Sequence, residues 1–407
     1  MIAGACNDQP AKQQDGTPAT NQGEAPAAYR QGSFGYDLDF LKKHDSVIVL
    51  QSDQGRAQVI VSAKYQGKVF TSTADGNSGQ SFGWIHYKAF TAAVDPHMNA
   101  YGGENRIWLG PEGGRFSLFF NKGAKMDFPN WRTPAAFDTE AWTVLSQNGQ
   151  SVSLQKDMQL VNYAGTALSL SVRRDISILD GQAIDSLLQL SPDTAIKIVG
   201  YQTVNTLTNT GQQEWTEKTG MPCIWMLDMF NPSPATVIII PYKEDVADKQ
   251  ARIATTDYFG QIPPDRVKYE KGVIYFKADG KSRGKLGVNP LRAKNMAGSY
   301  DAQNKVLTVT LFDTDPSGRF LNQEWNTVKP PFSGDAVNAY NDGPLADGSQ
   351  MGPFYEIESV SPAAFLQPGH SLTHKHAVFH FMGDERALDR VSTRLLGVSL
   401  SGVKTIF

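Results

Sequence analysis

The sequence has few or none of the motifs that mark several common enzyme classes. Only two of its 407 residues are cysteines and no CxxC motif is present, so a zinc ribbon has no support. No GxSxG motif occurs, and the GPEGG stretch at 110–114 lacks the GK[ST] ending of a phosphate-binding loop. These absences remove the motif-based arguments for a serine hydrolase, a zinc ribbon and a P-loop nucleotide-binding protein.

The sequence also lacks an excess of positive charge and a long hydrophobic run. Its 38 Lys and Arg residues face 41 Asp and Glu residues, for a formal net charge of −3. Such a balance gives no basic field to attract nucleic acid or an anionic membrane. No stretch approaches the roughly 18 consecutive apolar residues of a membrane helix. We therefore expect no nucleic-acid partner and no membrane span, and a neutral small molecule suits this charge balance better.

The N-terminal segment resembles the end of a bacterial lipoprotein signal. Cys6 follows small residues in MIAGAC, although the basic and apolar regions of such a signal are missing. The next two dozen residues are rich in Gln, Asn, Pro, Ala and Gly, a composition typical of a solvated tether. The alternative is a cysteine without a role near a flexible terminus. We predict a lipoprotein-like tether over 1–31, a lipid on Cys6 as the only membrane contact, and a cell-envelope location, either periplasmic or surface-exposed.

Residues 32–407 show no break in composition and predict one large all-β domain. Short alternating segments are separated by turn signals such as QNGQ, LDGQ and DAQNK. Helical signals occur only at 33–45 and at 384–397, so the pattern predicts an antiparallel β-sandwich with minor helices. Cys223, in MPCIWML, is expected to be a buried hydrophobe. The expected strands are 46–50, 57–63, 68–73, 116–120, 151–161, 167–179, 195–209, 235–242, 266–278, 305–313 and 376–382.

The stretch GPFYEIESVSPAAFLQPGHSLTHKHAVFHF at 352–381 gathers glutamates and histidines. Glu356 and Glu358 share one face of a strand, either as a functional carboxylate pair or as a solvent-facing pair on an outer sheet surface. His374 and His376 form an HxH motif that, with His380, fits a divalent metal such as zinc or nickel. The same pattern also fits histidines that bond backbone or carboxylates. The SPAAFLQPG break separates two strands, which we expect to be neighbours in one sheet.

Two loop-rich blocks, 95–120 and 322–359, combine aromatic, polar and glycine residues. Sugars are bound by aromatic faces and by side chains that hydrogen-bond hydroxyl groups. The alternatives are an internal Arg–Glu pair in the first block and turn chemistry in the second. The candidate sugar-binding residues are Arg106, Trp108, Glu112, Asn338, Tyr340 and Asp342.

The segments PEGGRFSLFF and FYEIESVSPAAFLQPGHSLTHKHAVFHF resemble the galactose mutarotase-like (supersandwich) superfamily, especially its uncharacterised bacterial lipoprotein members. The resemblance implies a β-supersandwich and a carbohydrate ligand. It further implies a late glutamate as catalytic base, here Glu356 or Glu358, and a mid-chain histidine as acid. No histidine lies between His97 and His370, so His86, His97 or the 374–380 cluster would have to supply the acid.

Three interpretations follow. The first is a carbohydrate-binding envelope protein that epimerises a sugar in the manner of an aldose 1-epimerase. The second is a glycan-binding lipoprotein without catalysis, which the missing mid-chain histidine favours. The third is a metal-dependent enzyme built on the HxH strand, and such a metal is the only cofactor that we consider.

Overall fold

The computed structural model describes residues 29–191 and 193–407. The predicted lipidation site Cys6 and most of the predicted tether lie outside these residues. The described chain begins close to helix α1 (Phe34–Leu41), which confirms the helix predicted over 33–45. The predicted C-terminal helix is α3 (Glu385–Leu396). Its N-cap Asp384 accepts hydrogen bonds from Arg386 and Ala387, and Gly397 ends it in a left-handed conformation, because glycine has no Cβ to clash there.

The strands of the described residues form three antiparallel sheets. The ten-stranded sheet contains, in spatial order, β12 (Val267–Glu270), β13 (Val273–Lys277), β10 (Thr236–Pro241), β15 (Met296–Asp301), β16 (Val306–Phe312), β19 (Ser371–Gly383), β8 (Ile196–Asn209), β7 (Ala167–Ile178), β6 (Ser151–Val161) and β5 (Thr143–Gln147). The six-stranded sheet contains β11 (Ala254–Thr255), β14 (Gly284–Val288), β17 (Val337–Asn341), β18 (Tyr355–Val360), β9 (Cys223–Phe230) and β4 (Arg106–Gly110). The small sheet contains β1 (Ile48–Ser52), β2 (Ala57–Ser62) and β3 (Lys68–Thr73).

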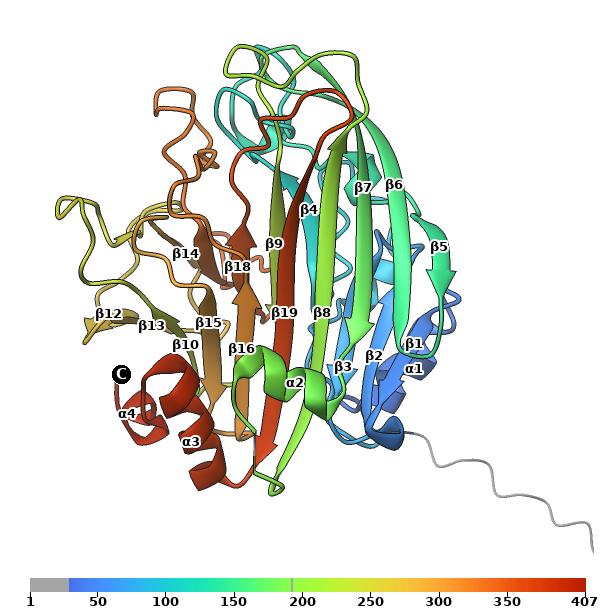
Figure 1. The fold of residues 1–407 in the computed structure, drawn as a ribbon, viewed down its shortest axis with the longest axis vertical. Helices are drawn as coiled ribbons and strands as arrows, with labels where there is room; N and C mark the ends of the chain where they lie inside the picture. Colours follow the sequence, from blue (N-terminus) through green and yellow to red (C-terminus); the bar gives the residue numbers. More distant parts are fainter. Residues whose placement is uncertain (1–28, 192) are drawn as a thin grey trace, which may run out of the picture.

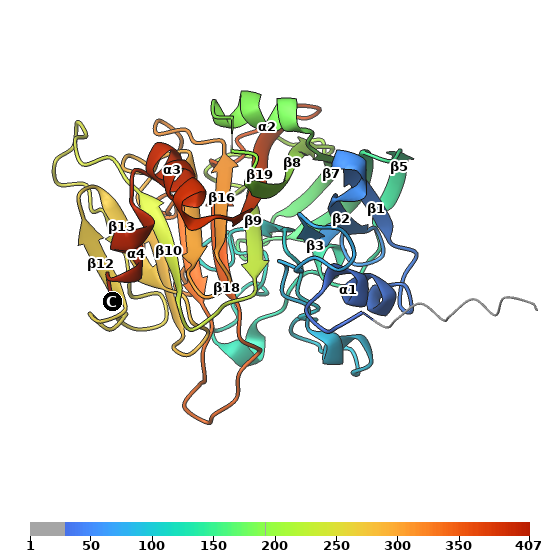
Figure 2. The same cartoon turned by 90° about the horizontal axis from the view of Figure 1, so that it is seen from below.

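The two large sheets form the layers of a sandwich, with the small sheet beside them (Figures 1 and 2). One continuous hydrophobic core contains residues of both layers, such as Val199 and Val378 from the ten-stranded sheet and Ile224 and Ile357 from the six-stranded sheet. Cys223 belongs to this core and is fully buried, which confirms the prediction for that residue. The all-β supersandwich with minor helices, expected from the sequence, is therefore the fold of this chain.

Three of the helices lie on the outer face of the ten-stranded sheet, whereas α1 packs against the small sheet. Helices α2 (Gly181–Leu188), α3 and α4 (Leu400–Lys404) lie across the ten-stranded sheet in Figure 1 and share a second hydrophobic cluster with β10, β16 and β19. Phe379 and Phe381 of β19 pack into this cluster, whereas Val378 packs into the core between the sheets. Among the described helices, none is long and apolar enough to cross a membrane.

Most of the predicted strands form, but the site region contains differences. Residues 116–120 were predicted as a strand and instead form a buried irregular segment, because Phe116, Phe119 and Phe120 pack into the core without pairing with a strand. Strands β4, β9, β14 and β17 were not predicted, although they build the six-stranded sheet. Their burial is continuous or nearly so, and buried strands lack the alternation by which strands are recognised in a sequence.

The glutamate strand and the histidine strand belong to different sheets. Glu356 and Glu358 lie on β18 of the six-stranded sheet, whereas His374, His376 and His380 lie on β19 of the ten-stranded sheet. The expectation that the two strands are neighbours in one sheet is therefore wrong. The ten-residue connection over 361–370 is long enough for the chain to cross from one layer to the other, whereas a tight hairpin turn would keep the two strands in one sheet.

Candidate functional site

One face of the six-stranded sheet carries the charged residues of the candidate site. Glu356 pairs with Tyr340 of β17 and Met229 of β9, and Glu358 pairs with Asn338 and Leu227. Residues that pair directly across neighbouring strands have side chains on the same side of the sheet. By the same registers, Lys285 lies opposite Tyr340, and Arg106 lies opposite Leu227. Three strands of separate sequence origin therefore bring two carboxylates and two cations to one face.

This face forms the wall of a cavity of about 170 Å³. The volume is smaller than the roughly 300–1,000 Å³ of pockets for drug-sized ligands, and suits a ligand of about one sugar ring. The opening is surrounded by the loops that carry Phe128, Phe259 and Met351, and these side chains are partly exposed. The lining residues are Met98, Arg106, Trp108, Glu112, Phe128, Trp131, Trp225, Leu227, Met229, Phe259, Arg283, Lys285, Trp325, Tyr340, Met351, Phe354 and Glu356.

Glu356 forms a buried ion pair with Arg106 at this wall. The two side chains are 9% and 8% exposed. Burial raises the pKa of Glu356 to about 7, since Arg106 opposes this shift only in part and the neighbouring Glu358 adds to it. A carboxyl group with a pKa near neutrality gains and loses a proton readily, as a general acid or base must. The alternative of a solvent-facing glutamate pair is therefore wrong.

Glu358 lies deeper than Glu356 and is fully buried. Its Oε2 accepts a hydrogen bond from Lys285 Nζ at 3.0 Å and another from Trp225 Nε1 at 2.8 Å. Lys285 Nζ also lies over the indole ring of Trp225, at 4.6 Å from its centroid. Lys285 and Trp225 line the cavity, whereas Glu358 is not among the lining residues. Glu358 therefore holds Lys285 and Trp225 in place.

Glu112 is the second carboxyl group of the cavity wall. Its backbone N–H donates to Gln323 Oε1 at 2.6 Å, which fixes the loop after β4. Burial raises the pKa of Glu112, and Glu358 adds to the rise, while Lys285 and Arg283 oppose it. Glu112 was predicted as a sugar-binding residue, and the structure places it in the wall of the cavity.

Of the other predicted sugar-binding residues, some line the cavity and some do not. Trp108 and Tyr340 line the cavity. Asn338 is buried beside Glu358 and is not among the lining residues. Asp342 is also outside the lining and accepts hydrogen bonds from Tyr340 OH at 2.8 Å and from the Gly352 N–H at 3.2 Å. Asp342 therefore positions Tyr340 and one end of the loop over residues 343–352.

The two upstream histidines stay outside the cavity. His97 stacks on Phe128, with ring centroids 4.5 Å apart, and its Nδ1 lies 2.8 Å from the backbone oxygen of Trp131. His86 stacks on Trp84 at 5.4 Å and lines a neighbouring cleft. Among the residues that the structure describes, no histidine lines the cavity. Neither residue is in position to be the predicted catalytic acid.

His374 and His376 lie between the sheets, on the other side of β18 from the glutamates. Ser359 Oγ is 2.8 Å from both His374 Nε2 and His376 Nδ1. His376 Nε2 is 2.7 Å from Asp228 Oδ2. Burial lowers the pKa of His374 to about 3, and His376 adds to this effect, so His374 is neutral.

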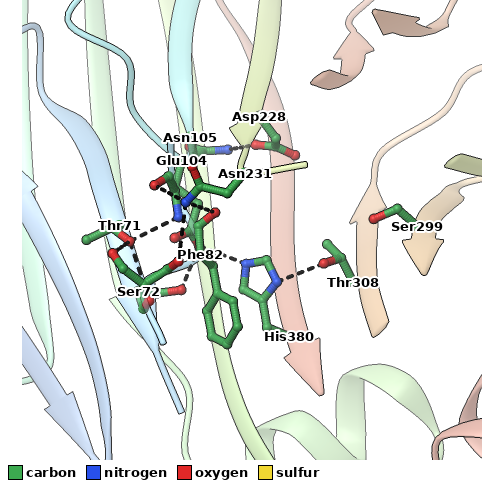
Figure 3. Close-up of polar contacts among 12 residues, drawn as sticks. Thr71, Ser72, Phe82, Glu104, Asn105, Asp228, Asn231, Ser299, Thr308 and His380 are labelled. Carbon is green, nitrogen blue, oxygen red and sulfur yellow. Dashed lines mark hydrogen bonds and ion pairs between the residues drawn. The ribbon is translucent and has the colours of Figure 1, made fainter. Parts of the chain in front are cut away.

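His380 forms a second buried group, which Figure 3 shows. Its ring lies between Glu104 and Thr308, with Nε2 at 3.0 Å from Glu104 Oε1 and Nδ1 at 2.9 Å from Thr308 Oγ1. Ser72 donates to the same Glu104 oxygen at 2.7 Å, and Phe82 stacks on the imidazole at 4.2 Å.

These contacts account for the three histidines without a metal ion. Each of the three residues is 1% exposed, and the imidazoles hydrogen-bond hydroxyl and carboxylate groups. Within 29–191 and 193–407, no group of three or more His, Cys, Asp or Glu residues is arranged to hold a metal ion. The metal site predicted on His374, His376 and His380 is therefore not formed in this part of the chain.

The order Ser359–His376–Asp228 is that of a serine-hydrolase triad, yet the group cannot reach a substrate. All three side chains are at most 1% exposed, in the core between the sheets. A nucleophile of this kind must reach the carbonyl carbon that it attacks. We therefore assign the histidine groups to holding the two layers together, since a buried polar group is costly unless it is hydrogen-bonded.

Several residues of the cavity wall were not singled out in the sequence. Arg283 and Lys285 alternate with small or apolar residues in RGKLGV, and this period of two was a signal for a shared strand face. Five further residues of the wall are aromatic and lie far apart along the chain, so no local pattern could group them. They are Phe128, Trp131, Phe259, Trp325 and Phe354.

The chain has weak similarity to several solved structures. A protein of Escherichia coli K12, provisionally named an aldose 1-epimerase, is 13% identical, with 82% of this chain and 98% of that chain covered and a TM-score of 0.48. A galactose mutarotase-like protein from Lactobacillus casei is 11% identical, with 82% and 100% covered and a TM-score of 0.47. A galactose mutarotase related enzyme from Lactobacillus acidophilus is 10% identical, with 83% and 97% covered and a TM-score of 0.43.

The family comparison covers nearly all of the described chain. A search of curated proteins finds no match. One family model matches residues 32–407, the same range that the sequence predicted as a single domain. The chain therefore belongs to the family of unknown function DUF6786.

Proposed function

We propose that this protein binds a sugar in the cavity of the six-stranded sheet and interconverts its anomers. The observation that carries the proposal is that two carboxyl groups with raised pKa values, Glu356 and Glu112, line the same small cavity. Acid–base catalysis needs one group that accepts a proton and one that donates it. Glu112 takes the role of the acid, which the resemblance assigned to a histidine.

The ion pair with Arg106 keeps part of the Glu356 population ionised at neutral pH, because the guanidinium opposes the effect of burial. Glu356 then accepts the proton of the anomeric hydroxyl group. Glu112, whose pKa is raised chiefly by desolvation, donates a proton to the ring oxygen as the bond from that oxygen to the anomeric carbon breaks. Rotation of the open-chain aldehyde and the reverse proton transfers then give the other anomer, and both glutamates regain their initial states.

The remaining wall suits a sugar ligand. Trp108, Trp131 and Trp225 supply aromatic faces for the C–H side of a ring, and Arg283 and Lys285 supply donors for hydroxyl groups. Arg283 is held between the ring of Phe259, at 3.9 Å from its centroid, and Tyr340 OH, at 3.2 Å. These donors are therefore in place before a ligand arrives, which lowers the cost of binding.

A second candidate function is sugar binding without turnover. It is favoured by the Arg106 ion pair, since a carboxylate held by a cation is a weaker base than an unpaired one. The envelope location that the sequence suggests fits either function.

The test is exchange spectroscopy by NMR on a panel of aldoses, with galactose, glucose, mannose, xylose and arabinose as probes. The first candidate predicts faster exchange between α and β anomers of at least one sugar. Glu356→Gln and Glu112→Gln should each slow it by about 100-fold or more, the range of general acid–base catalysis. Glu324→Gln, which alters the ion pair with Lys329 outside the cavity, should leave the rate unchanged.

The same samples separate the two candidates. Binding by calorimetry without faster exchange would favour the binding protein. Neither binding nor exchange across the panel would overturn both.

A further inference from the structure

A second and larger opening adjoins the sugar cavity. This cleft has a volume of about 850 Å³ and is formed by helix α1, the segment at 78–88 and residues 351–353. Its volume lies within the roughly 300–1,000 Å³ of ligand pockets, and it is several times the volume of the sugar cavity.

Met351 lines both openings and is 36% exposed. The wall between them is thin. Trp84 lines the cleft and packs on Phe354, with ring centroids 4.8 Å apart, and Phe354 lines the sugar cavity. Met351 and the Trp84–Phe354 pair therefore lie at the boundary between the cavity and the cleft.

The cleft offers the same kinds of contact as the cavity. Tyr36 and Tyr87 are partly exposed aromatic rings that contact each other edge to face, with centroids 5.8 Å apart. Asp37 accepts hydrogen bonds from Tyr87 and Ser81, which holds the tyrosine ring in place. The exposed side chains of Arg30 and Lys88 add donors for hydroxyl or carboxylate groups. Fixed aromatic rings beside charged donors suit a second sugar unit.

We propose that the ligand is an oligosaccharide, with its terminal unit in the cavity and the following units in the cleft. This inference rests on the proposed function, because it extends the same site. Two observations carry it: the shared Met351, and the cleft wall of aromatic rings and donors. A chain bound in this way gains contacts that a single sugar does not make.

The test is calorimetry on the full chain with sugars of increasing length. The probes are galactose, glucose and mannose with the matching β-1,4-linked disaccharides and trisaccharides, and maltose and maltotriose. For a sugar series that binds, we expect the disaccharide or trisaccharide to bind about tenfold or more tightly than the monosaccharide, a gain of about 1.4 kcal/mol.

Variants in the cleft locate this gain. Tyr36→Ala should remove most of the gain for the longer sugar and leave the affinity for the monosaccharide unchanged. Tyr36→Phe, which keeps the ring, should retain it. Lys88→Ala changes an exposed side chain and tests the cleft if Tyr36→Ala does not fold. Tyr269→Ala, at an exposed position on β12 outside both openings, is the matched control.

The outcomes distinguish the two proposals. Equal affinities for short and long sugars would overturn the oligosaccharide proposal and leave the sugar site standing. A length-dependent gain that persists in both Tyr36→Ala and Lys88→Ala would also overturn the assignment to the cleft. If none of the probes binds, the proposed function fails, and the extension fails with it.

Discussion

Arg106 and Glu356 are 250 residues apart in the sequence and form a buried ion pair at the wall of one cavity. The arginine lies on β4 and the glutamate on β18, and both pair with β9, which lies between them. The pair therefore depends on three strands being in register. It also sets the protonation of the residue that we propose as the catalytic base.

Removing Arg106 should shift the pH dependence of sugar exchange. Without its cation, Glu356 remains buried beside Glu358, so its pKa should rise further. For Arg106→Leu we expect the acidic limb of the rate–pH profile to move up by about 1 pH unit or more. Exchange rates between pH 5 and 9 measure this. Arg56→Leu, which removes an exposed ion pair with Asp53, serves as the control. An acidic limb at the same pH in Arg106→Leu and in the wild type would contradict the role of the Arg106–Glu356 pair.

The raised pKa of Glu356 should also appear in the pH dependence of stability. Its pKa is about 7 in the folded chain and near 4.5 when unfolded, so the folded state binds the proton more tightly. The stability contributed by this group is complete below pH 4.5 and is lost as the pH rises through about 7.

The matched comparison is between the wild type and Glu356→Gln, which has no titrating group there. Urea unfolding at several pH values measures the free energy of unfolding of both proteins. As the pH rises, that of the glutamine variant should increase relative to the wild type by an amount on the order of 3 kcal/mol. A stability difference that does not change between pH 4 and 8 would argue against the raised pKa.

The buried pair of Lys285 and Glu358 should behave as a unit. Lys285→Met leaves the buried Glu358 carboxylate without its cation, and Glu358→Gln leaves the lysine without its anion. Each single change should lower the free energy of unfolding by about 3–5 kcal/mol. The double variant should cost less than the sum of the two, by about 1 kcal/mol or more, in a urea-unfolding cycle. Additive costs would show that the two groups do not interact.

Replacing His376 should lower the stability of the fold. His376→Phe keeps a ring in the core and removes the imidazole partner of the fully buried Asp228. We expect the free energy of unfolding to fall by about 2–4 kcal/mol. His370→Phe, at an exposed position before β19, is the control and should change it by less than about 0.5 kcal/mol. A His376→Phe variant as stable as the wild type would contradict the proposed link between the layers.

Removal of metal should have no effect on the fold. The ring nitrogens of His374, His376 and His380 contact hydroxyl or carboxylate groups of the core. Dialysis against a chelator should therefore leave the melting temperature unchanged. Stoichiometric zinc or nickel in untreated protein, lost in His376→Ala, would restore the metal hypothesis.

The sequence by itself determined what depends on neighbours in the chain. Alternation predicted an all-β chain, and it put Glu356 and Glu358 on one face of a strand, because successive side chains point to opposite sides. The cap of α3 at Asp384 and its end at Gly397 were local signals of the same kind. Most predicted strands of the ten-stranded sheet form for this reason.

Only the tertiary structure decided where those faces point and what they meet. The glutamate face could have met solvent, and instead it meets Arg106 and Lys285 from strands that the sequence did not reveal. The histidine strand joined the other sheet and turned its imidazoles into the core. Which residues share a face is a local property of one strand, whereas the pairing of distant strands depends on the packing of the whole chain. That packing placed Glu112, not a histidine, in the wall of the same cavity as Glu356.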